Sequence, residues 1–356
     1  MGFKPRFSKS PPPVETATPA PAISGSDPLA GLGRYSHGRT ALQYGLAAGG
    51  LRAGDRVLVP DFVCDAMVLP LQQLQLVPVY FPVESDLQPR WSALDSLASD
   101  DTRALVMIHY FGIPQAVDRY RDFCRGRNLI LIEDNAHGFG GRFEGEMLGT
   151  LGDIAISSPW KNFAIRNGGL LYVAGASDRA FESLSQQPRR FFPSRRKILG
   201  LVEAGWRKHC RYYGHGLQTI PPTAPLPAWR MSEESVAFLR GQDFAAGATR
   251  RRDIYETWQR WALRSGLEPV IERLAGAEAP LLFPAYCRDP DYRHALLEWA
   301  WRRRIEASTW PKLPPEVLAG AGAAQAYWAR MICLPIHQDM PAADLVNYLD
   351  LCGPVP

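Results

Sequence analysis

A segment near the middle of the chain brings together side chains that could carry out chemistry. Its first apolar run, LILIED, ends in the acidic pair Glu133 and Asp134, and His137 follows three residues later. A second apolar run, IAISS, contains Ser157, and Lys161 follows it. Short apolar runs of this kind are typical of buried parallel strands, and ligands bind at the carboxyl ends of such strands. The segment therefore predicts that a carboxylate, a hydroxyl and a lysine amine lie at the ends of neighbouring strands.

These three groups suit the chemistry of a pyridine cofactor that carries an aldehyde. A lysine amine can form a Schiff base with an aldehyde. A carboxylate beside a pyridine nitrogen keeps that nitrogen protonated, because opposite charges attract strongly in a partly desolvated site. Together they are the protein's part of pyridoxal 5'-phosphate (PLP) chemistry, in which the cofactor's ring is the electron sink. The sequence therefore predicts PLP as the cofactor.

The cofactor's phosphate needs a binding site of its own, which the start of a predicted helix could form. Gly38, Arg39 and Thr40 open this helix, and its first backbone N–H groups favour an anion. Glycine lets the backbone approach the phosphate closely, and Ser157 could add a hydroxyl donor. Each signal is weak alone: a glycine before a helix is usually a turn, and a lone Lys is usually a solvated surface residue.

The composition excludes several classes of protein. With 46% hydrophobic and 21% charged residues, the chain of 356 residues is too apolar to be disordered or fibrous. Its 40 basic and 36 acidic residues leave a formal charge of +4, which argues against nucleic-acid binding. The six cysteines form no CxxC pair, so we expect neither a disulfide scaffold nor a metal site. No apolar run reaches the ~20 residues of a membrane span, and the N-terminus lacks a signal-peptide core, so we expect a soluble, cytoplasmic protein.

Short apolar runs alternate with helical patterns along most of the chain. This alternation is typical of βαβ units and predicts an α/β fold with a mostly parallel central sheet and helices on both faces. We expect strands over 56–60, 77–83, 103–110, 129–134, 154–158 and 168–175, and helices over 38–51, 64–75, 91–98 and 117–127. Later segments predict helices over 230–265 and 294–305 and a strand over 331–337.

The composition also divides the chain. Residues 1–32 hold seven of the 31 prolines and bury too little apolar surface to offset their ordering entropy, so we expect a flexible tail. We predict a large PLP-binding domain over residues 33–240 and a smaller α+β domain over 241–356. Residues 188–213 carry eight Arg or Lys interleaved with aromatic residues. This basic stretch could hold a diphosphate or touch an anionic membrane, although a solvated amphipathic cover over the sheet is the simpler interpretation.

The motifs taken together resemble the DegT/StrS family of sugar aminotransferases, which are fold-type I PLP enzymes. The resemblance is carried by GRTAL, GDRVLVP, PVYFPV, HYFG, IEDNAHGFGG, LGTLGDIAISS with a Lys three residues further on, RMSEE and CLPIHQD. It runs from about residue 35 to residue 340 and is strongest over 129–169. It implies the fold-type I PLP-transferase architecture, with a small C-terminal α+β domain beside the central sheet.

The resemblance also assigns roles to individual residues. Lys161 resembles the Schiff-base lysine, which also moves protons between the cofactor and the amino acid. Asp134 resembles the partner of the cofactor's ring nitrogen, and His137 lies where the family has a Gln or His near the ring hydroxyl. Ser157 and the turn of Gly38, Arg39 and Thr40 match the family's phosphate binders. Arg230, in RMSEE, matches a helix start near the family's subunit interface.

Departures from the family pattern concern the cofactor's ring and the partner subunit. Cys64 stands where the family often has an aromatic residue that stacks on the ring, so the stacking either falls to Phe62 or Tyr110 or is lost. Ala228 stands where the family often has an Asn that reaches into the partner's site. Lys161 itself discriminates within the family, because relatives that dehydrate sugars carry His at this position.

The histidines outside the central segment have two interpretations each. His109, in IHYFG, ends a predicted strand and could contact the ligand or satisfy a backbone group. His337, in LPIHQD, matches a C-terminal family motif and would act near the site from the small domain.

The sequence therefore predicts a PLP-dependent aminotransferase. By resemblance, it would move an amino group from glutamate or glutamine to a keto-sugar, a nucleotide-linked one, in polysaccharide or secondary-metabolite biosynthesis. The resemblance also implies a homodimer with sites at the interface. The alternative is a non-catalytic homologue that acts as a scaffold or regulator, which would explain Cys64 and Ala228. A binding protein without PLP is disfavoured, because no GxGxxG motif follows a predicted strand.

Overall fold

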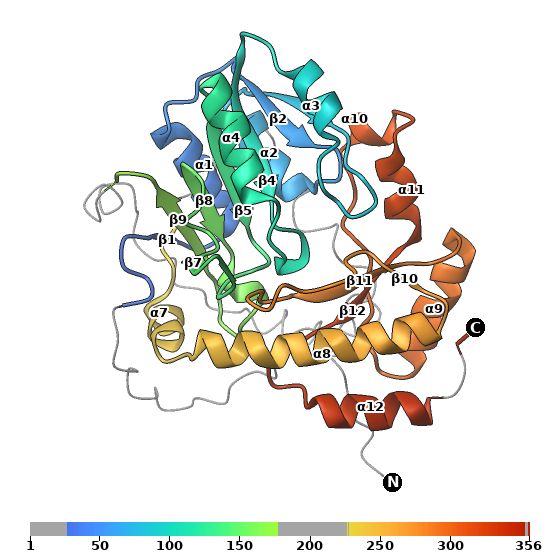
Figure 1. Cartoon of the computed structure of the whole chain (residues 1–356). Coiled ribbons are helices and arrows are strands. Elements are labelled where there is room, and N and C mark those ends of the chain that lie inside the picture. The colour runs from blue at the N-terminus through green and yellow to red at the C-terminus, as the bar shows by residue number, and fades with distance from the viewer. Residues whose placement is uncertain (1–26, 177–225, 227, 353–354) are drawn as a thin grey trace, which may run out of the picture.

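The computed structural model describes residues 27–176, 226, 228–352 and 355–356 (Figure 1). Its elements in chain order are β1 (Gly33–Tyr35), α1 (Gly38–Ala48), β2 (Arg56–Pro60), α2 (Asp65–Gln73), β3 (Val77–Phe81), α3 (Trp91–Leu97), β4 (Thr102–Ile108), η1 (Tyr110–Gly112), α4 (Val117–Arg127), β5 (Ile130–Asn135), β6 (Arg142–Phe143), β7 (Glu146–Met147), β8 (Ile154–Ser157), η2 (Pro159–Lys161) and β9 (Gly169–Val173). They continue with α7 (Glu233–Arg240), α8 (Phe244–Arg264), β10 (Glu268–Pro269), β11 (Leu282–Tyr286), α9 (Pro290–Arg302), α10 (Pro315–Leu318), α11 (Ala323–Arg330), β12 (Met331–Pro335) and α12 (Ala342–Leu351).

A seven-stranded sheet forms the larger half of the molecule, in the order β1-β9-β8-β5-β4-β2-β3. β3, β2, β4, β5 and β8 are parallel neighbours, whereas β9 runs antiparallel to β8 and β1 antiparallel to β9. The central strands are apolar runs such as RVLVP and TRALVMI, as expected for strands buried on both faces. The predicted α/β fold with a mostly parallel central sheet is confirmed.

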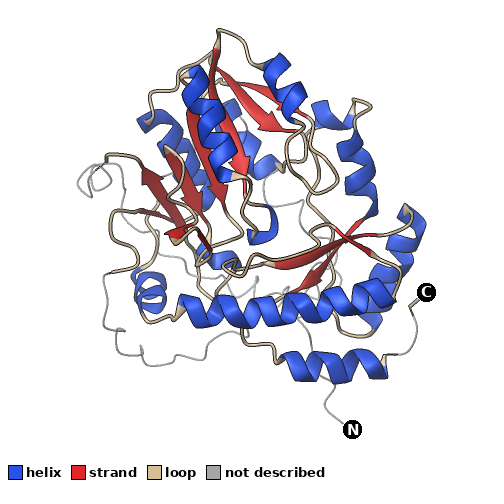
Figure 2. Ribbon diagram, viewed as in Figure 1, coloured by secondary structure: helices blue, strands red, loops and turns tan. Residues whose placement is uncertain are grey.

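Helices cover both faces of this sheet (Figures 1 and 2). α1 packs on β8 and β9 and also contacts α2, while α4 packs on β4 and β5. The connections from β2 to β3, from β3 to β4 and from β4 to β5 pass through the helices α2, α3 and α4, whereas the connection from β5 to β8 passes through the hairpin of β6 and β7. Because these strands are parallel, the carboxyl ends of β2, β4, β5 and β8 come together at one edge. This edge is where a ligand is expected in a sheet of this type.

A second, antiparallel sheet of three strands, in the order β10-β11-β12, lies beside the first (Figure 1). The long helix α8 packs on β10 and β11 and on α12. Their contacts form a separate apolar core, which includes Tyr255, Trp258 and Phe283. These elements form the smaller α+β part that the sequence predicts, although the exact domain boundaries at 32 and 240 stay a prediction.

Two of the differences between the predicted elements and the structure have a clear local cause. The helical pattern over 230–265 forms two helices, because Asp243 caps the start of α8 by accepting a hydrogen bond from the Ala246 N–H at 2.9 Å. The strand predicted over 103–110 ends at Ile108. There the backbone turns sharply, with left-handed φ angles of 57° at Phe111 and 85° at Gly112.

The N-terminal segment enters the fold before the predicted end of the tail. Leu29 and Leu32 are buried and belong to one cluster with Phe139 and Phe163. The basic stretch 188–213 lies outside the described residues, as do Lys197 and Lys208 within it. Within the described ranges, no helix is long and apolar enough to cross a membrane.

Candidate functional site

The carboxyl-end edge of the sheet holds a cavity of about 80 Å³. Five of the predicted catalytic and cofactor-binding residues line it: Gly38, Arg39, Asp134, His137 and Lys161. They come from the start of α1, the end of β5 and the turn η2 after β8. The topology thus brings together groups that lie more than 120 residues apart in the sequence.

The acidic pair at the end of β5 is divided between two roles. Asp134 lines the cavity, and its Oδ1 accepts a hydrogen bond from the Ala136 N–H at 2.9 Å. Burial raises the pKa of Asp134, while the nearby Lys161 and this hydrogen bond work against the rise. Glu133 is fully buried away from solvent, where its carboxylate accepts hydrogen bonds from the backbone N–H groups of Leu151 at 2.6 Å and Gly152 at 3.0 Å.

His109 completes the surroundings of Glu133. Its Nδ1 accepts a hydrogen bond from the Gln115 N–H at 3.1 Å, so the ring proton is assigned to Nε2. Nε2 lies 3.0 Å from Glu133 Oε1 and donates to it. Although His109 also lines the cavity, both of its ring nitrogens form hydrogen bonds within the protein. His109 therefore serves the fold, which is the second of its two sequence interpretations.

His137 has one free ring nitrogen. Its Nδ1 accepts a hydrogen bond from the Phe111 N–H at 3.2 Å, which leaves Nε2 as the protonated nitrogen. Burial lowers the pKa of His137 well below its ordinary value, and the positive charge of Lys161 adds to this. The imidazole is therefore neutral and can act as a hydrogen-bond donor toward an oxygen in the cavity.

Contacts from three segments hold the chain that carries Lys161. The side chain of the next residue, Asn162, donates from Nδ2 to the His137 carbonyl at 3.1 Å. The Asn162 carbonyl accepts hydrogen bonds from Arg251 Nη2 at 2.7 Å and from Gln338 Nε2 at 3.1 Å. The turn is thus tied to the loop after β5, to α8 and to the segment after β12.

Sequence reasoning missed Asn162, Arg251 and Gln338. Arg251 is fully buried, and burial lowers its pKa to about 9. Their neighbour His337, which was singled out from the sequence, is buried close by but does not line the cavity. Burial lowers the pKa of His337 to about 3. The NAHG and PIHQD motifs gave a signal for the region, but only the fold shows which side chains meet.

An anion would find a suitable place at the start of α1. Gly38 lies against Ser158, and a Cβ atom at position 38 would overlap the Ser158 hydroxyl. The first turn of α1 contains no acidic residue. The half-buried Arg39 beside it has no hydrogen-bond partner for its Nε among the described residues, and burial lowers its pKa. A free helix start, a hydroxyl and an uncompensated guanidinium together fit a phosphate group.

Three residues predicted to bind the cofactor do not line the cavity. Thr40 is buried in α1. Ser157 points away, where its Oγ accepts a hydrogen bond from Asn135 Nδ2 at 3.1 Å, because successive side chains alternate in direction along a strand. The neighbouring Ser158 lines the cavity instead. Phe62 is fully buried behind the cavity, with its ring against those of Tyr110 and Trp310.

The other sequence departures also have a place in the structure. Cys64 caps the start of α2 and lines the cavity. Ala228 is buried, and Arg230 forms an isolated antiparallel bridge with Tyr35. Two further lining residues, Trp160 and Trp310, were not predicted from the sequence. Trp310 could have been noticed as an aromatic residue beside the Pro-flanked loop that contains Lys312.

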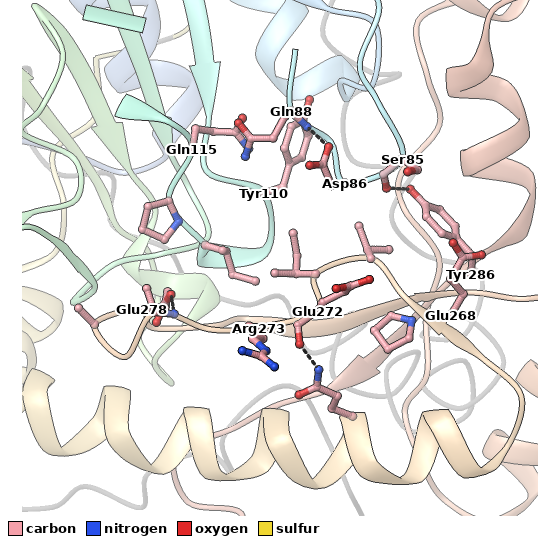
Figure 3. Close-up of a pocket in the computed structure, with 18 of the residues that line it drawn as sticks. Ser85, Asp86, Gln88, Tyr110, Gln115, Glu268, Glu272, Arg273, Glu278 and Tyr286 are labelled. Atoms are coloured by element: carbon pink, nitrogen blue, oxygen red, sulfur yellow. Dashed lines mark hydrogen bonds between the residues drawn. The ribbon is translucent and has the colours of Figure 1, made fainter. Parts of the chain in front are cut away.

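A larger, open cavity of about 1340 Å³ lies elsewhere (Figure 3). It separates the 85–88 and 110–115 loops of the large sheet from residues 266–278 of the small one. Tyr286 spans one end of it, where its hydroxyl donates to the Ser85 carbonyl at 2.8 Å. Tyr110 lies on its wall, whereas Lys161 and Asp134 do not. Asp134 and Lys161, which were predicted to act on the cofactor, therefore line the smaller cavity and not the larger one.

The residues of the smaller cavity fit pyridoxal phosphate. They offer a carboxylate for the ring nitrogen, a neutral imidazole donor for the ring hydroxyl, a primary amine for the aldehyde and a glycine-lined cradle for the phosphate. The cavity is smaller than the roughly 300–1,000 Å³ of typical small-molecule sites, so wall residues must move to admit the cofactor. In the described ranges, no group of three or more His, Cys, Asp or Glu could hold a metal ion.

Comparisons with known proteins agree with this geometry. Residues 34–184 match the model of the DegT/DnrJ/EryC1/StrS aminotransferase family, which confirms the resemblance. A GDP-perosamine synthase of Escherichia coli O157:H7 is 31% identical over 134 residues, 37% of this chain and 37% of the relative. A dTDP-4-dehydro-2,6-dideoxy-D-glucose 3-dehydratase of Saccharopolyspora spinosa is 27% identical over 252 residues, 66% of this chain and 51% of the relative. The chain spans about two fifths of the length of the first curated relatives it matches.

A solved structure extends the likeness to the whole fold. The PLP form of Spr1654 from Streptococcus pneumoniae, a protein assigned as a sugar aminotransferase, superposes with a TM-score of 0.73 and 16% identity. The superposition covers 98% of this chain and 98% of that one. The predicted fold-type I architecture is therefore confirmed.

Proposed function

We propose that this protein is a PLP-dependent aminotransferase that moves an amino group from an amino acid to a keto-sugar. The observation that carries the proposal is the meeting of Asp134, His137 and Lys161 in one cavity that the Gly38–Ser158 cradle also lines. The family match over residues 34–184 supports the same activity.

Each of these residues has a distinct task. PLP, when bound, supplies the electron sink for bond cleavage at the amino acid's α-carbon. The Asp134 carboxylate, once ionised, holds a proton on the ring nitrogen by charge attraction. The His137 Nε2–H donates to the ring oxygen. The Lys161 amine would hold the cofactor at its aldehyde group and, once free, would carry a proton to and from the substrate carbon as a general base and acid. Ser158 and the N–H groups of α1 bind the phosphate.

The names of relatives support a choice of substrates. We propose a nucleotide-linked keto-sugar as the acceptor, because named relatives include GDP-perosamine synthase and a dTDP-sugar 4-aminotransferase. We propose glutamate or glutamine as the donor, because two other relatives are named as L-glutamine aminotransferases. Polysaccharide or secondary-metabolite biosynthesis in the cytoplasm, by a homodimer, completes the proposal. A dehydratase among the relatives makes the position of Lys161 important, since the family resemblance pairs lysine with transamination.

A second candidate is a non-catalytic homologue that acts as a scaffold or regulator. Cys64 in the cavity and the buried Ala228 favour it, because both replace residues that the family often uses at the site. A homologue of this kind would bind no PLP in its cavity, or would bind PLP without reacting with an amino donor.

The visible spectrum of the purified protein with added PLP separates the two candidates. We expect an absorbance band, borohydride reduction to leave the adduct on Lys161, and glutamate to bleach the band. Lys161→Ala is the control: it should retain its fold and form no reducible adduct. An adduct on Lys197 or Lys208, or no band at all, would support the scaffold.

A further inference from the structure

We propose that Trp310 is the aromatic residue that covers the cofactor's ring in this enzyme. The proposal rests on the proposed function, because it assigns a binding residue to the PLP site. Trp310 lies in the loop between α9 and α10, about 150 residues beyond Lys161, yet it lines the same cavity as Asp134 and Lys161.

At the position of Cys64 the cavity lacks the aromatic wall that the family often has. Cys64, the N-cap of α2, offers only a thiol at this wall. The buried ring of Phe62 is turned away from the cavity, against Tyr110 and Trp310. Among the described residues that line the cavity, the indoles of Trp160 and Trp310 are therefore the candidates for stacking on a pyridine ring.

Aromatic neighbours hold the indole of Trp310 in place. Its side chain is 4% exposed. Its ring centroid lies 5.0 Å from Phe62, 5.6 Å from Tyr110 and 5.2 Å from Phe111. The His137 ring lies 5.7 Å away at 78°, so the indole is edge-to-face with the imidazole that would bind the ring hydroxyl. Four neighbours thus fix the indole before any ligand arrives, and preorganisation of this kind favours binding.

The indole N–H supplies a second, independent observation. Trp310 Nε1 is buried and has no hydrogen-bond partner among the residues that the structure describes. Other tryptophans of the same half donate this proton to a carbonyl: Trp301 to Ala307 at 2.8 Å and Trp328 to Pro311 at 2.9 Å. A buried donor is normally satisfied, so the Trp310 N–H is available for an oxygen atom of the bound cofactor or substrate.

Trp160 is the rival and has the opposite character. It is 43% exposed, directly precedes Lys161 and has no aromatic neighbour in the described part of the chain. The cavity of about 80 Å³ must widen to admit PLP. The exposed Trp160 can move aside, whereas Trp310 would have to break four ring contacts. Trp310 therefore stays as the wall, and Trp160 marks the mouth.

PLP titration of the full-length protein, followed by visible absorbance and visible circular dichroism, tests the assignment. We compare the wild type with Trp310→Phe, Trp310→Leu and Trp160→Leu, and with the control Trp301→Phe. Trp310→Leu should weaken PLP binding by about tenfold or more and change the sign or size of the visible dichroism. Trp310→Phe, which keeps a ring, should restore most of the affinity. Trp160→Leu and Trp301→Phe should bind like the wild type.

The outcomes separate this assignment from the proposed function. A wild type that binds no PLP overturns both. A wild type that binds PLP while Trp310→Leu, shown to be folded by far-UV dichroism, binds it equally well with an unchanged visible signal overturns the assignment alone. Loss of affinity in Trp160→Leu instead would transfer the stacking to Trp160. If Trp310→Leu does not fold, Trp310→His decides, because it keeps a planar ring of smaller area and should give an intermediate affinity; wild-type affinity there counts against stacking.

Discussion

Gly38 and Ser158 touch across the start of α1, so closely that a Cβ atom at position 38 would overlap the Ser158 hydroxyl. This contact sets the hydroxyl beside the first N–H groups of the helix, where it can share a phosphate with them. Ser158→Ala should therefore weaken PLP binding by about tenfold or more, since it removes a hydrogen bond to a charged acceptor. Equilibrium titration by visible absorbance measures the change.

Ser157→Ala is the matched control for this prediction. The Ser157 hydroxyl accepts a hydrogen bond from Asn135 on the other side of the strand. Its loss should leave PLP affinity within about threefold of the wild type and cost about 1 kcal/mol of unfolding free energy. A reversed pattern, with Ser157→Ala losing the cofactor, would restore the residue expected from the sequence.

The buried carboxylate of Asp134 should destabilise the cofactor-free protein. Burial raises the pKa of its carboxyl above the ordinary value of 3.8, so the folded state holds the proton more tightly than the unfolded state. The free energy of unfolding therefore falls as the pH rises from the pKa of the unfolded chain to that of the folded protein. Asp134→Asn removes the charge and keeps an oxygen to accept the Ala136 N–H. At pH 8 the cofactor-free variant should be more stable than the wild type by about 1–3 kcal/mol and should have no aminotransferase activity.

Urea unfolding of both cofactor-free proteins at pH 5 and pH 8 checks the sign. The advantage of the variant should shrink toward pH 5, where more of the wild-type carboxyl is protonated. A wild type that is the more stable of the two at pH 8 would show that Lys161 compensates the buried charge fully.

Substitution of Glu133, unlike substitution of Asp134, should destabilise the protein, although the two residues are adjacent. The buried carboxylate of Glu133 accepts hydrogen bonds from the Leu151 and Gly152 N–H groups and from His109. Glu133→Gln would place an amide N–H₂ against these donors and leave at least one of them unsatisfied. We expect a loss of about 3 kcal/mol in unfolding free energy, measured in urea at pH 7. Unchanged stability would mean that the pocket around Glu133 rearranges.

The contrast between Glu133 and Asp134 shows which features of the site can be predicted from the sequence. Strand periodicity and the family motifs place Glu133 and Asp134 at a strand end, and they predict which strands are neighbours. They also select Lys161, Asp134 and His137 as one site. These signals are local, because each comes from a short run with a characteristic spacing.

Side-chain direction and distant contacts are what the sequence did not yield. Ser157 matches the family's phosphate binder in the sequence, but Ser158 lines the cavity, because the direction of each side chain depends on where β8 ends. Phe62 was one of two residues expected to supply the stacking, and the fold instead buries it against Trp310. Arg251, Gln338 and Trp310 reach the site from the second sheet's half, and no local pattern encodes such an approach.

Asp61, at the end of β2, should make stability depend on pH in a second, measurable way. Its carboxyl is 8% exposed and accepts a hydrogen bond from the Val83 N–H at 3.2 Å. Burial raises its pKa from 3.8 to about 6. Below about pH 3 both folded and unfolded chains hold the proton; between about pH 3 and 6 the unfolded chain releases it first, so unfolding becomes easier as the pH rises. The shift corresponds to about 3 kcal/mol in total, of which about 2 kcal/mol is lost between pH 4.5 and 7.

Asp61→Asn isolates this contribution, because its amide oxygen can still accept the Val83 N–H while no charge forms. Other titrating groups affect both proteins alike, so the quantity to measure is the difference between their urea unfolding free energies at each pH. The variant should gain about 2 kcal/mol on the wild type between pH 4.5 and pH 7. A difference that stays constant with pH would mean that the carboxyl of Asp61 titrates in the folded protein as it does in the unfolded chain, and that water reaches it at the end of β2.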